Sequence, residues 1–194
     1  TSRNIDSQNG VTWNQSSGSL TFAGTGQATF SGGTVSFNNA FAAQMPASIA
    51  GATVNFNGTA ALGAGLSLSS GSLQGSGAVT LGGTSTWTGG SMAGTGSTAI
   101  ASGALLNVGG SVSLNRNLTI NSGGTLDYQA GIFTVGAGAT LTNNGTLALT
   151  SNDPAADMTG SGALINNGVL LAAASTPRSE EHTSELQSRE TISY

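Results

Sequence analysis

Few side chains in this sequence are of the types that catalyse reactions. The candidates are three aspartates, Asp127, Asp153 and Asp157, with Arg116 as the nearest cation. Polysaccharide hydrolases and lyases need clustered carboxylates, or a carboxylate with a strong base. Asp127 and Asp153 are 26 residues apart, so they would approach each other only if the chain wound around about once between them.

The rest of the composition argues against an enzyme. Residues 1–177 contain no lysine, glutamate, cysteine or histidine, and their net charge is 2 − 4 = −2, from Arg3, Asp6, Arg116, Asp127, Asp153 and Asp157. An aspartate-rich strand motif is also absent, and without cysteine there is no thiolate chemistry. We therefore predict no catalytic residue, with a polysaccharide-acting lyase or hydrolase as the alternative.

Two motifs suggest a ligand but are better explained without one. Asp153 and Asp157 lie in a loop whose oxygen atoms would suit calcium, yet the nonapeptide repeat of calcium-binding β-rolls is absent. An apolar-x-Gly-Ser/Thr-Gly motif resembles a phosphate loop, but no helix N-terminus or lysine follows it. We predict no metal and no cofactor site, and we interpret the motif as a recurring corner at Phe22–Gly26, Leu73–Gly77, Met92–Gly96 and Met158–Gly162.

Composition also excludes two classes of partner. The sequence has no basic patch for nucleic acid and no run of eighteen apolar residues for a membrane span. Low charge with 31 glycines is typical of flexible linkers, but a chain with regular apolar positions can bury enough surface to fold.

The large apolar side chains recur with a period of 19 residues, which lengthens to 20 and 21 towards the C-terminus. The three columns are Val11, Phe30, Ile49, Leu68, Trp87, Leu106, Leu126 and Leu147; Val35, Val54, Leu73 and Met92; and Leu62, Leu81, Ile100, Ile120 and Leu141. A period this short, with no helical spacing inside it, is typical of a solenoid of stacked β-coils.

Each period contains short stretches in which apolar and small polar residues alternate, such as Thr34–Phe37 and Thr146–Leu149. Alternation points one set of side chains inward and the other outward, and Gly and Asn between the stretches permit sharp corners. We predict an all-β, single-domain parallel β-helix (β-solenoid) with about three strands per coil and 19–21 residues per coil. About nine coils would form a rod roughly 43 Å long at 4.8 Å per coil.

Two other structures compete locally with the coils. Residues 41–49 (FAAQMPASI) could begin a helix, but Pro46 interrupts the stretch, and we predict a coil with an irregular corner. Asn57-Gly58, Asn144-Gly145 and Asn167-Gly168 would ordinarily indicate two-residue hairpins. An antiparallel meander is thus the alternative fold, which the strict recurrence disfavours.

Residues 178–194 (RSEEHTSELQSRETISY) differ from the rest of the chain. They contain six of its twelve charged residues and its only histidine, His182. The segment resembles the translation of a DNA sequencing adapter, so we expect a non-native, disordered tail. A genuine charged tail is the alternative.

The chain starts at Thr1 without a signal-peptide pattern, and we expect residues 1–177 to be a fragment of a longer repeat protein.

Stretches such as Thr86–Gly96 (TWTGGSMAGTG) and Gly138–Leu147 (GATLTNNGTL) resemble the β-strand repeats of large secreted bacterial proteins. These are the autotransporter passenger domains and the filamentous-haemagglutinin-like adhesins, and the resemblance covers most of residues 10–177. It implies a right-handed β-helical stalk that is secreted and displayed on the bacterial cell surface through parts of a longer parent protein.

We accordingly expect a non-catalytic structural or adhesive stalk segment that mediates attachment or spacing. Its expected partners are host or cell-surface glycans or proteins, or further copies of itself. A third hypothesis is ice binding through a threonine array, suggested by Thr84-Ser85-Thr86. The outward positions look too variable from coil to coil to form such an array, so we expect no ice binding.

Overall fold

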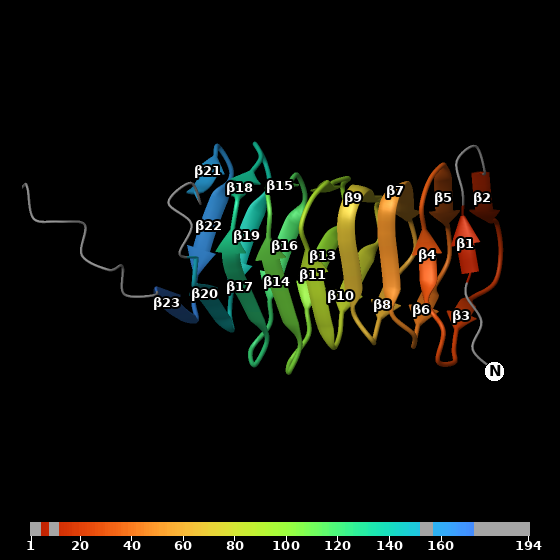
Figure 1. The fold of residues 1–194 in the computed structure, drawn as a ribbon, viewed down its shortest axis with the longest axis horizontal. Helices are drawn as coiled ribbons and strands as arrows, with labels where there is room; N and C mark the ends of the chain where they lie inside the picture. Colours follow the sequence, from red (N-terminus) through yellow and green to blue (C-terminus); the bar gives the residue numbers. More distant parts are fainter. Residues whose placement is uncertain (1–4, 8–11, 152–156, 173–194) are drawn as a thin grey trace, which may run out of the picture.

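The computed structural model describes residues 5–7, 12–151 and 157–172, which form one elongated β-solenoid (Figure 1). The colours in Figure 1 run in order from one end of the rod to the other, so the chain advances along the axis as it winds. All regular elements in these ranges are strands, and every strand pairing is parallel. The predicted parallel β-helix is therefore confirmed, and the antiparallel meander is wrong.

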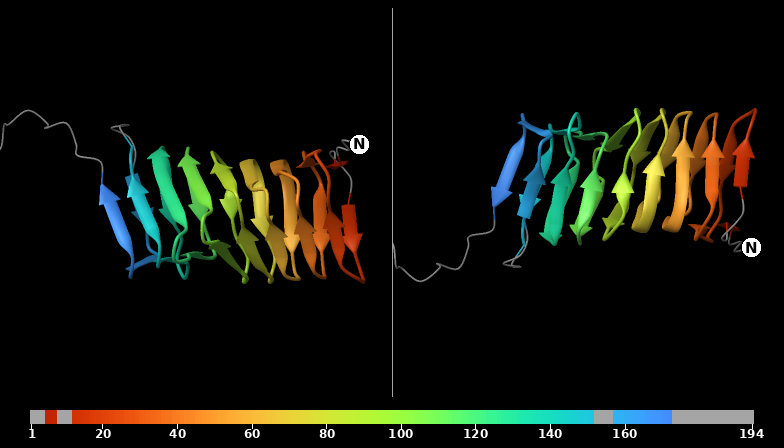
Figure 2. Two further views of the ribbon diagram at one scale, coloured as in Figure 1. Left: turned by 90° about the horizontal axis from the view of Figure 1, so that it is seen from below. Right: turned by 90° about the horizontal axis from the view of Figure 1, so that it is seen from above.

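The strands fall into three sets that stack along the rod, which we call faces 1, 2 and 3 (Figure 2). Face 1 contains β1 (Ile5–Ser7), β4 (Ala28–Phe30), the first part of β7 (Ala47–Phe56), the first part of β9 (Leu66–Gln74), β11 (Thr84–Trp87), β14 (Leu105–Gly109), β17 (Thr125–Ala130), β20 (Thr146–Leu149) and β23 (Val169–Ala172). Face 2 contains β2 (Thr12–Gln15), β5 (Thr34–Phe37), the second parts of β7 and β9, β12 (Ser91–Met92), β15 (Val112–Leu114), β18 (Ile132–Val135) and β21 (Asp157–Gly160). Face 3 contains β3 (Leu20–Phe22), β6 (Phe41–Ala43), β8 (Ala60–Leu62), β10 (Ala78–Leu81), β13 (Ser97–Ile100), β16 (Asn117–Ile120), β19 (Thr140–Asn143) and β22 (Ala163–Asn166). The described residues thus make about eight turns, one fewer than predicted.

The predicted columns are stacks of buried side chains along most of the rod. Phe30 pairs with Ile49, Ile49 with Leu68, and Leu68 with Trp87, and all four side chains are buried. The columns that begin at Val35 and Leu62 are confirmed as far as Met92 and Ile120. Val11 lies outside the described residues, and the residue that pairs with Phe30 from the preceding coil is Ser7.

Two further predicted neighbours are wrong, each because a corner is two residues longer than the corner of the preceding coil. Val108, and not Leu106, lies over Trp87, because four residues link β13 to β14 where two link β10 to β11. Similarly, Leu141 lies over Leu118, and Asn143 lies over Ile120. A shift of two residues preserves the alternation of a strand, so Leu106 and Leu141 remain buried.

The three Asn-Gly pairs considered above each lie at a corner, where the chain turns from one face to the next. Asn57-Gly58 links β7 to β8, Asn144-Gly145 links β19 to β20, and Asn167-Gly168 links β22 to β23. A Cβ atom built on Gly58 would lie 2.4 Å from the carbonyl oxygen of Asn39 in the coil below. The glycines are therefore required by the close stacking of successive corners. Residues 41–49, which could have begun a helix, instead form β6, a corner and the start of β7, as predicted.

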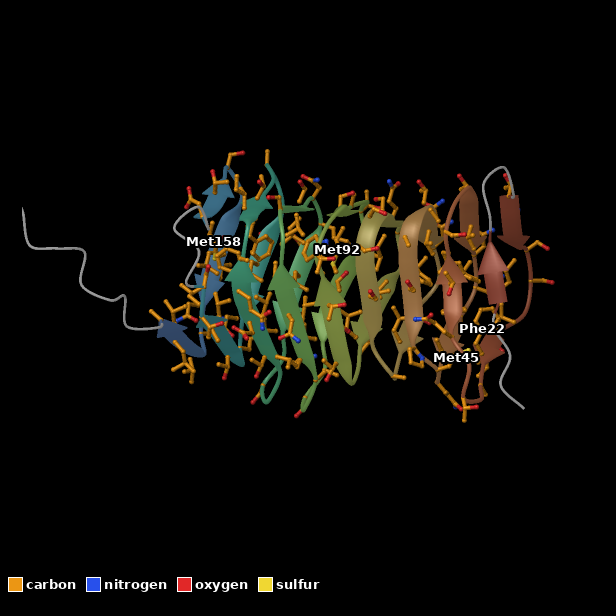
Figure 3. All side chains as sticks on the ribbon, viewed as in Figure 1. Phe22, Met45, Met92 and Met158 are labelled. Carbon is orange, nitrogen blue, oxygen red and sulfur yellow. The ribbon has the colours of Figure 1, made fainter. Side chains whose placement is uncertain are left out.

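The apolar-x-Gly-Ser/Thr-Gly motif marks corners, but not one corner throughout. Leu73–Gly77, Met92–Gly96 and Met158–Gly162 each lead from face 2 to face 3. Phe22–Gly26 instead leads from face 3 to face 1. Figure 3 shows Met92 and Met158 in the upper half of the rod and Phe22 in the lower half. The motif is a corner sequence, as predicted, and it occurs at two different corners of the coil.

Glycine is needed at the corner between faces 1 and 2 for both conformation and space. Gly71 has a φ of 82°, and a Cβ atom there would lie 2.3 Å from the carbonyl oxygen of Ala52. Gly103, at the corner between faces 3 and 1, has a similar φ of 75°, but no atom lies within 4 Å of a Cβ atom built there. Gly103→Ala thus measures the conformational cost alone, about 1–2 kcal/mol.

We predict that Gly71→Ala destabilises the solenoid by at least twice as much as Gly103→Ala, because the added methyl group must push neighbouring coils apart. The measurement is the free energy of unfolding of both variants from denaturant titrations followed by circular dichroism. Equal losses of stability would contradict close stacking at this corner.

Candidate functional site

Asp127 lies on the outer surface of face 1, at the middle of β17. Its carboxylate accepts hydrogen bonds from Nε2 of Gln129, at 2.8 Å, and from the hydroxyl group of Thr150. Nε2 of Gln129 also contacts Oδ1 of Asn107 in the coil below, at 3.2 Å. Asp127 is thus the centre of a polar network across three coils, and the hydrogen-bond partners found for its carboxylate are all neutral.

Arg116 lies at the corner between β15 and β16, and only 2% of its surface is exposed. Its Nη1 donates a hydrogen bond to the carbonyl oxygen of Ala93, at 3.2 Å. Its Nη2 donates to the carbonyl oxygens of Gly77 and Ser97, both at 2.8 Å. One guanidinium group therefore joins three successive coils through backbone carbonyl groups.

A column of glycines makes room for this guanidinium group. Gly58, Gly77 and Gly96 occupy one corner position in consecutive coils, and Arg116 occupies it in the next coil. A Cβ atom on Gly96 would lie 2.5 Å from Nη2 of Arg116. The side chain of Arg116 therefore folds back over the glycines that precede it.

Burial lowers the pKa of Arg116 from its ordinary value to about 10, because desolvation disfavours the charged form. The group remains protonated at neutral pH, where the three carbonyl oxygens accept its hydrogen bonds. Its Nε has no hydrogen-bond partner in the structure. Arg116 is thus a structural cation, and it is buried away from any surface where a substrate could bind.

The described residues among those considered for catalysis, Asp127, Asp157 and Arg116, are not assembled into a site. Asp127 lies on face 1, whereas Asp157 is exposed at the start of β21 on face 2. Asp153 lies outside the described residues, so the structure does not address its pairing with Asp127 or a calcium site in its loop. Within the described ranges, no three His, Cys, Asp or Glu residues are grouped closely enough to hold a metal ion.

Face 2 carries a feature that the sequence analysis missed. One row of residues along this face consists of serines and threonines, which pair in register from coil to coil in the order Thr12, Thr34, Thr53, Ser72, Ser91, Ser113, Thr134 and Thr159. We call this row the hydroxyl ladder. The expectation that no regular outward array exists is therefore wrong for face 2. The signal was present in the sequence, because all but the first and last rungs directly precede an inward apolar residue.

Hydrogen bonds between neighbouring coils run along the same face. The hydroxyl groups of Ser72 and Ser91 are 2.9 Å apart. In the adjacent outward row, Nδ2 of Asn55 donates to the hydroxyl group of Ser36 at 3.2 Å. At the following corner, Asn57 donates to Asn38 at 2.7 Å, and Asn38 donates to Asn14. Between β2 and β18, face 2 is therefore a surface rich in neutral hydroxyl and amide groups, and Asp157 lies beyond it at the start of β21.

Thr84-Ser85-Thr86 contributes little to such a surface. Thr84 and Thr86 are exposed, but Ser85 points inward and is buried. Its hydroxyl oxygen accepts a hydrogen bond from the backbone N–H group of Leu66 at 3.0 Å. The serine thus satisfies a buried backbone donor in the preceding coil.

A shallow hollow of about 320 Å³ lies at the N-terminal end of face 2. The described residues that line it are Thr12, Asn14, Gln15, Leu20, Ser36 and Phe37, and none of these is ionisable. Acid–base chemistry requires a titratable group in reach of the substrate. The hollow can therefore bind a neutral polar group but lacks the side chains for that chemistry.

Comparison of the chain with protein-family models, with curated proteins and with solved structures finds no match. In the described residues there is no helix that could cross a membrane. A solenoid fold is compatible with many functions, so the function has to be argued from the surface chemistry of this chain.

We predict that Arg116→Ala destabilises the solenoid by about 2–3 kcal/mol, the typical range for hydrogen bonds from a charged group. Arg116→Lys should recover less than half of this loss, because an ammonium group lacks the planar fork that reaches several carbonyl oxygens. Denaturant unfolding of each variant is the measurement. Asp127→Asn, which removes a charge from the outer surface, serves as the control and should change the stability by about 0.5 kcal/mol or less.

The result that would contradict this role is an Arg116→Ala variant as stable as the Asp127→Asn control. The guanidinium group would then contribute nothing to the joining of the three coils.

Proposed function

We propose that this chain is a non-catalytic stalk segment that spaces or attaches surfaces through its outer faces. The observation that supports this most is the hydroxyl ladder, an ordered row of eight residues along the rod. Stacked parallel strands give such a row a spacing of about 4.8 Å. A rod with a repeated polar face is suited to contacts that are individually weak and collectively strong.

Glycans are the partner that this surface suits best. Hydroxyl and amide side chains both donate and accept hydrogen bonds, as sugar hydroxyl groups do. The ladder residues are neutral, and the neighbouring outward row adds Asn14, Ser36, Asn55 and Gln74. Binding by such a face should depend little on salt, because no ionic contacts are involved.

The resemblance to autotransporter passenger domains and filamentous-haemagglutinin-like adhesins gives this proposal its setting. On that basis the rod belongs to a secreted protein displayed on a bacterial cell surface. The low number of charged groups and the absence of cysteine are compatible with export. Host or cell-surface proteins are the other partners that a stalk of this kind could contact.

The hydroxyl ladder also bears on ice binding, the hypothesis suggested by the threonines. An ice-binding face needs hydroxyl groups that are free to order water. Here Ser72 is buried, its hydroxyl group bonds to that of Ser91, and Ser36 accepts a bond from Asn55. Because part of the face is satisfied internally, we favour glycan binding over ice binding.

We predict that the chain binds neutral glycans on an array and that Thr34→Val with Thr53→Val weakens this binding at least tenfold. Valine retains the shape of threonine but removes the hydroxyl group that would contact the sugar. Thr80→Val, which removes an exposed hydroxyl group from face 3, is the matched control and should bind as the parent chain does. Undiminished binding by the face 2 variant would exclude the ladder as the contact surface.

We predict no turnover when the chain is incubated with a panel of polysaccharides and assayed for reducing or unsaturated ends. The reason is that Asp127 has only neutral partners and Arg116 is buried. Turnover that disappears in Asp127→Ala would overturn the non-catalytic proposal and favour a polysaccharide lyase or hydrolase.

A further inference from the structure

The N-terminal half of face 2 carries a second polar row beside the hydroxyl ladder. The residues two positions after the first four rungs also pair in register from coil to coil, in the order Asn14, Ser36, Asn55 and Gln74. Neighbours within each row are about 4.8 Å apart along the rod, and the two rows are about 6.6 Å apart. We call this grid, made of Thr12, Thr34, Thr53 and Ser72 with Asn14, Ser36, Asn55 and Gln74, the double row.

The hydroxyl groups at the centre of the double row are free to bind a ligand. Thr34 and Thr53 are half-buried, and the hydrogen bonds of the described residues involve neither of their hydroxyl groups. Ser72 differs, because it is buried and its hydroxyl group bonds to that of Ser91. The accessible part of the double row therefore covers three coils, from Thr12 to Thr53.

The second row is held in place by hydrogen bonds between coils. Asn55 donates to the hydroxyl group of Ser36 at 3.2 Å, and Asn38 donates to the side-chain oxygen of Asn14. A side-chain amide has two N–H donors and a carbonyl acceptor, so Asn55 retains groups for a ligand. Thr12, Asn14 and Ser36 also line the shallow hollow at the N-terminal end of this face. The second row is thus an ordered set of neutral donors and acceptors.

Face 1 lacks a comparable pair of rows. One of its outward rows is also hydroxylated over four coils, in the order Thr29, Ser48, Ser67 and Thr86. The positions two residues before or after this row include Pro46, Gly65 and Ala50, whose side chains form no hydrogen bonds. A ligand that needs hydrogen bonds on two edges is therefore better served by face 2.

An extended chain of equatorially linked pyranose rings matches the double row. Such a chain carries hydroxyl groups on both of its edges, and it advances by one ring over nearly the distance of one coil. Because hydroxyl and amide groups both donate and accept hydrogen bonds, each edge of the chain can bond to one of the two rows. A helical chain, as formed by axially linked rings, would turn most of its hydroxyl groups away from a straight row.

We propose that an extended, neutral polysaccharide lies along the rod axis over the double row, with one ring over each of the three accessible coils. This inference rests on the proposed glycan binding, to which it adds the shape, the direction and the position of the ligand. Each ring contributes little by itself, because its hydrogen bonds replace bonds to water. The affinity should therefore rise with the number of rings until the accessible coils are covered.

NMR titration of the isotope-labelled full chain with glucose oligomers tests the shape of the ligand. We expect cellotetraose to bind at least tenfold more tightly than cellobiose, because it contacts all three coils at once. Cellohexaose should bind within about threefold of cellotetraose, because further rings find no additional free rungs. Maltotetraose contains the same sugar in a helical chain, and it should bind at least tenfold more weakly than cellotetraose.

The outcomes separate this inference from the function on which it rests. If neutral glycans bind on an array but cellotetraose binds no better than cellobiose or maltotetraose, the extended chain is wrong and glycan binding stands. If no neutral glycan binds at all, both fail.

Substitution of the second row tests whether both edges of the chain are in contact. We expect Ser36→Ala with Asn55→Ala to weaken cellotetraose binding at least fivefold, because one edge loses its partners. Ser48→Ala with Ser67→Ala, which removes two hydroxyl groups from face 1, is the matched control and should bind as the parent chain does. Circular dichroism shows whether each variant retains its strands. Unchanged affinity of a folded second-row variant would overturn the proposal.

A nitroxide label on the reducing end of cellotetraose tests the direction of the chain. A chain that lies along the rod places its end near Thr12 or Ser72, so the label should broaden the amide signals there more than that of Thr34. Broadening centred instead on Asn38 and Asn57, at the corner beside face 2, would mean that the chain lies across the rod. That result would overturn the axial alignment.

Discussion

Direct stacking of each residue on the equivalent residue of the previous coil is the constraint on which the rest of this structure depends. Parallel strands place these residues about 4.8 Å apart, so every corner also lies directly over another corner. Where the corners stack most closely, as at Gly58 and Gly71, a Cβ atom has no space and glycine satisfies the constraint. The same stacking aligns Phe30 with Ile49 in the core and Thr34 with Thr53 on the surface.

Stability in such a rod comes from contacts between neighbouring coils, because one coil alone buries too little apolar surface to fold. The inward columns provide most of the burial, and stacked aromatic rings such as Phe37 and Phe56 add to it, with centroids 5.3 Å apart. Polar contacts follow the same direction, from the hydroxyl pair of Ser72 and Ser91 to the amide pair of Asn38 and Asn57. Arg116 extends this pattern over three coils at once.

The functional proposals follow from what stacking does to a surface. A residue type that recurs once per coil becomes a continuous row, so a modest preference for Ser and Thr becomes the hydroxyl ladder of face 2. Isolated ionisable groups are not multiplied in this way, and Asp127 remains a single carboxylate among neutral partners.

The sequence by itself determined the coil fold and most of the core. Alternation at period two and recurrence near 19 residues are local properties, and they correctly marked Trp87, Leu106 and Leu141 as inward. Where the period departs from 19 residues, only the tertiary structure decided which residues are neighbours, because a corner with two additional residues moves Val108, and not Leu106, over Trp87. It likewise decided that the side chain of Arg116 turns back over Gly96, and that Asp127 bonds to Thr150. These contacts depend on the shape of the adjacent coil, and a pattern along one strand carries no record of that shape.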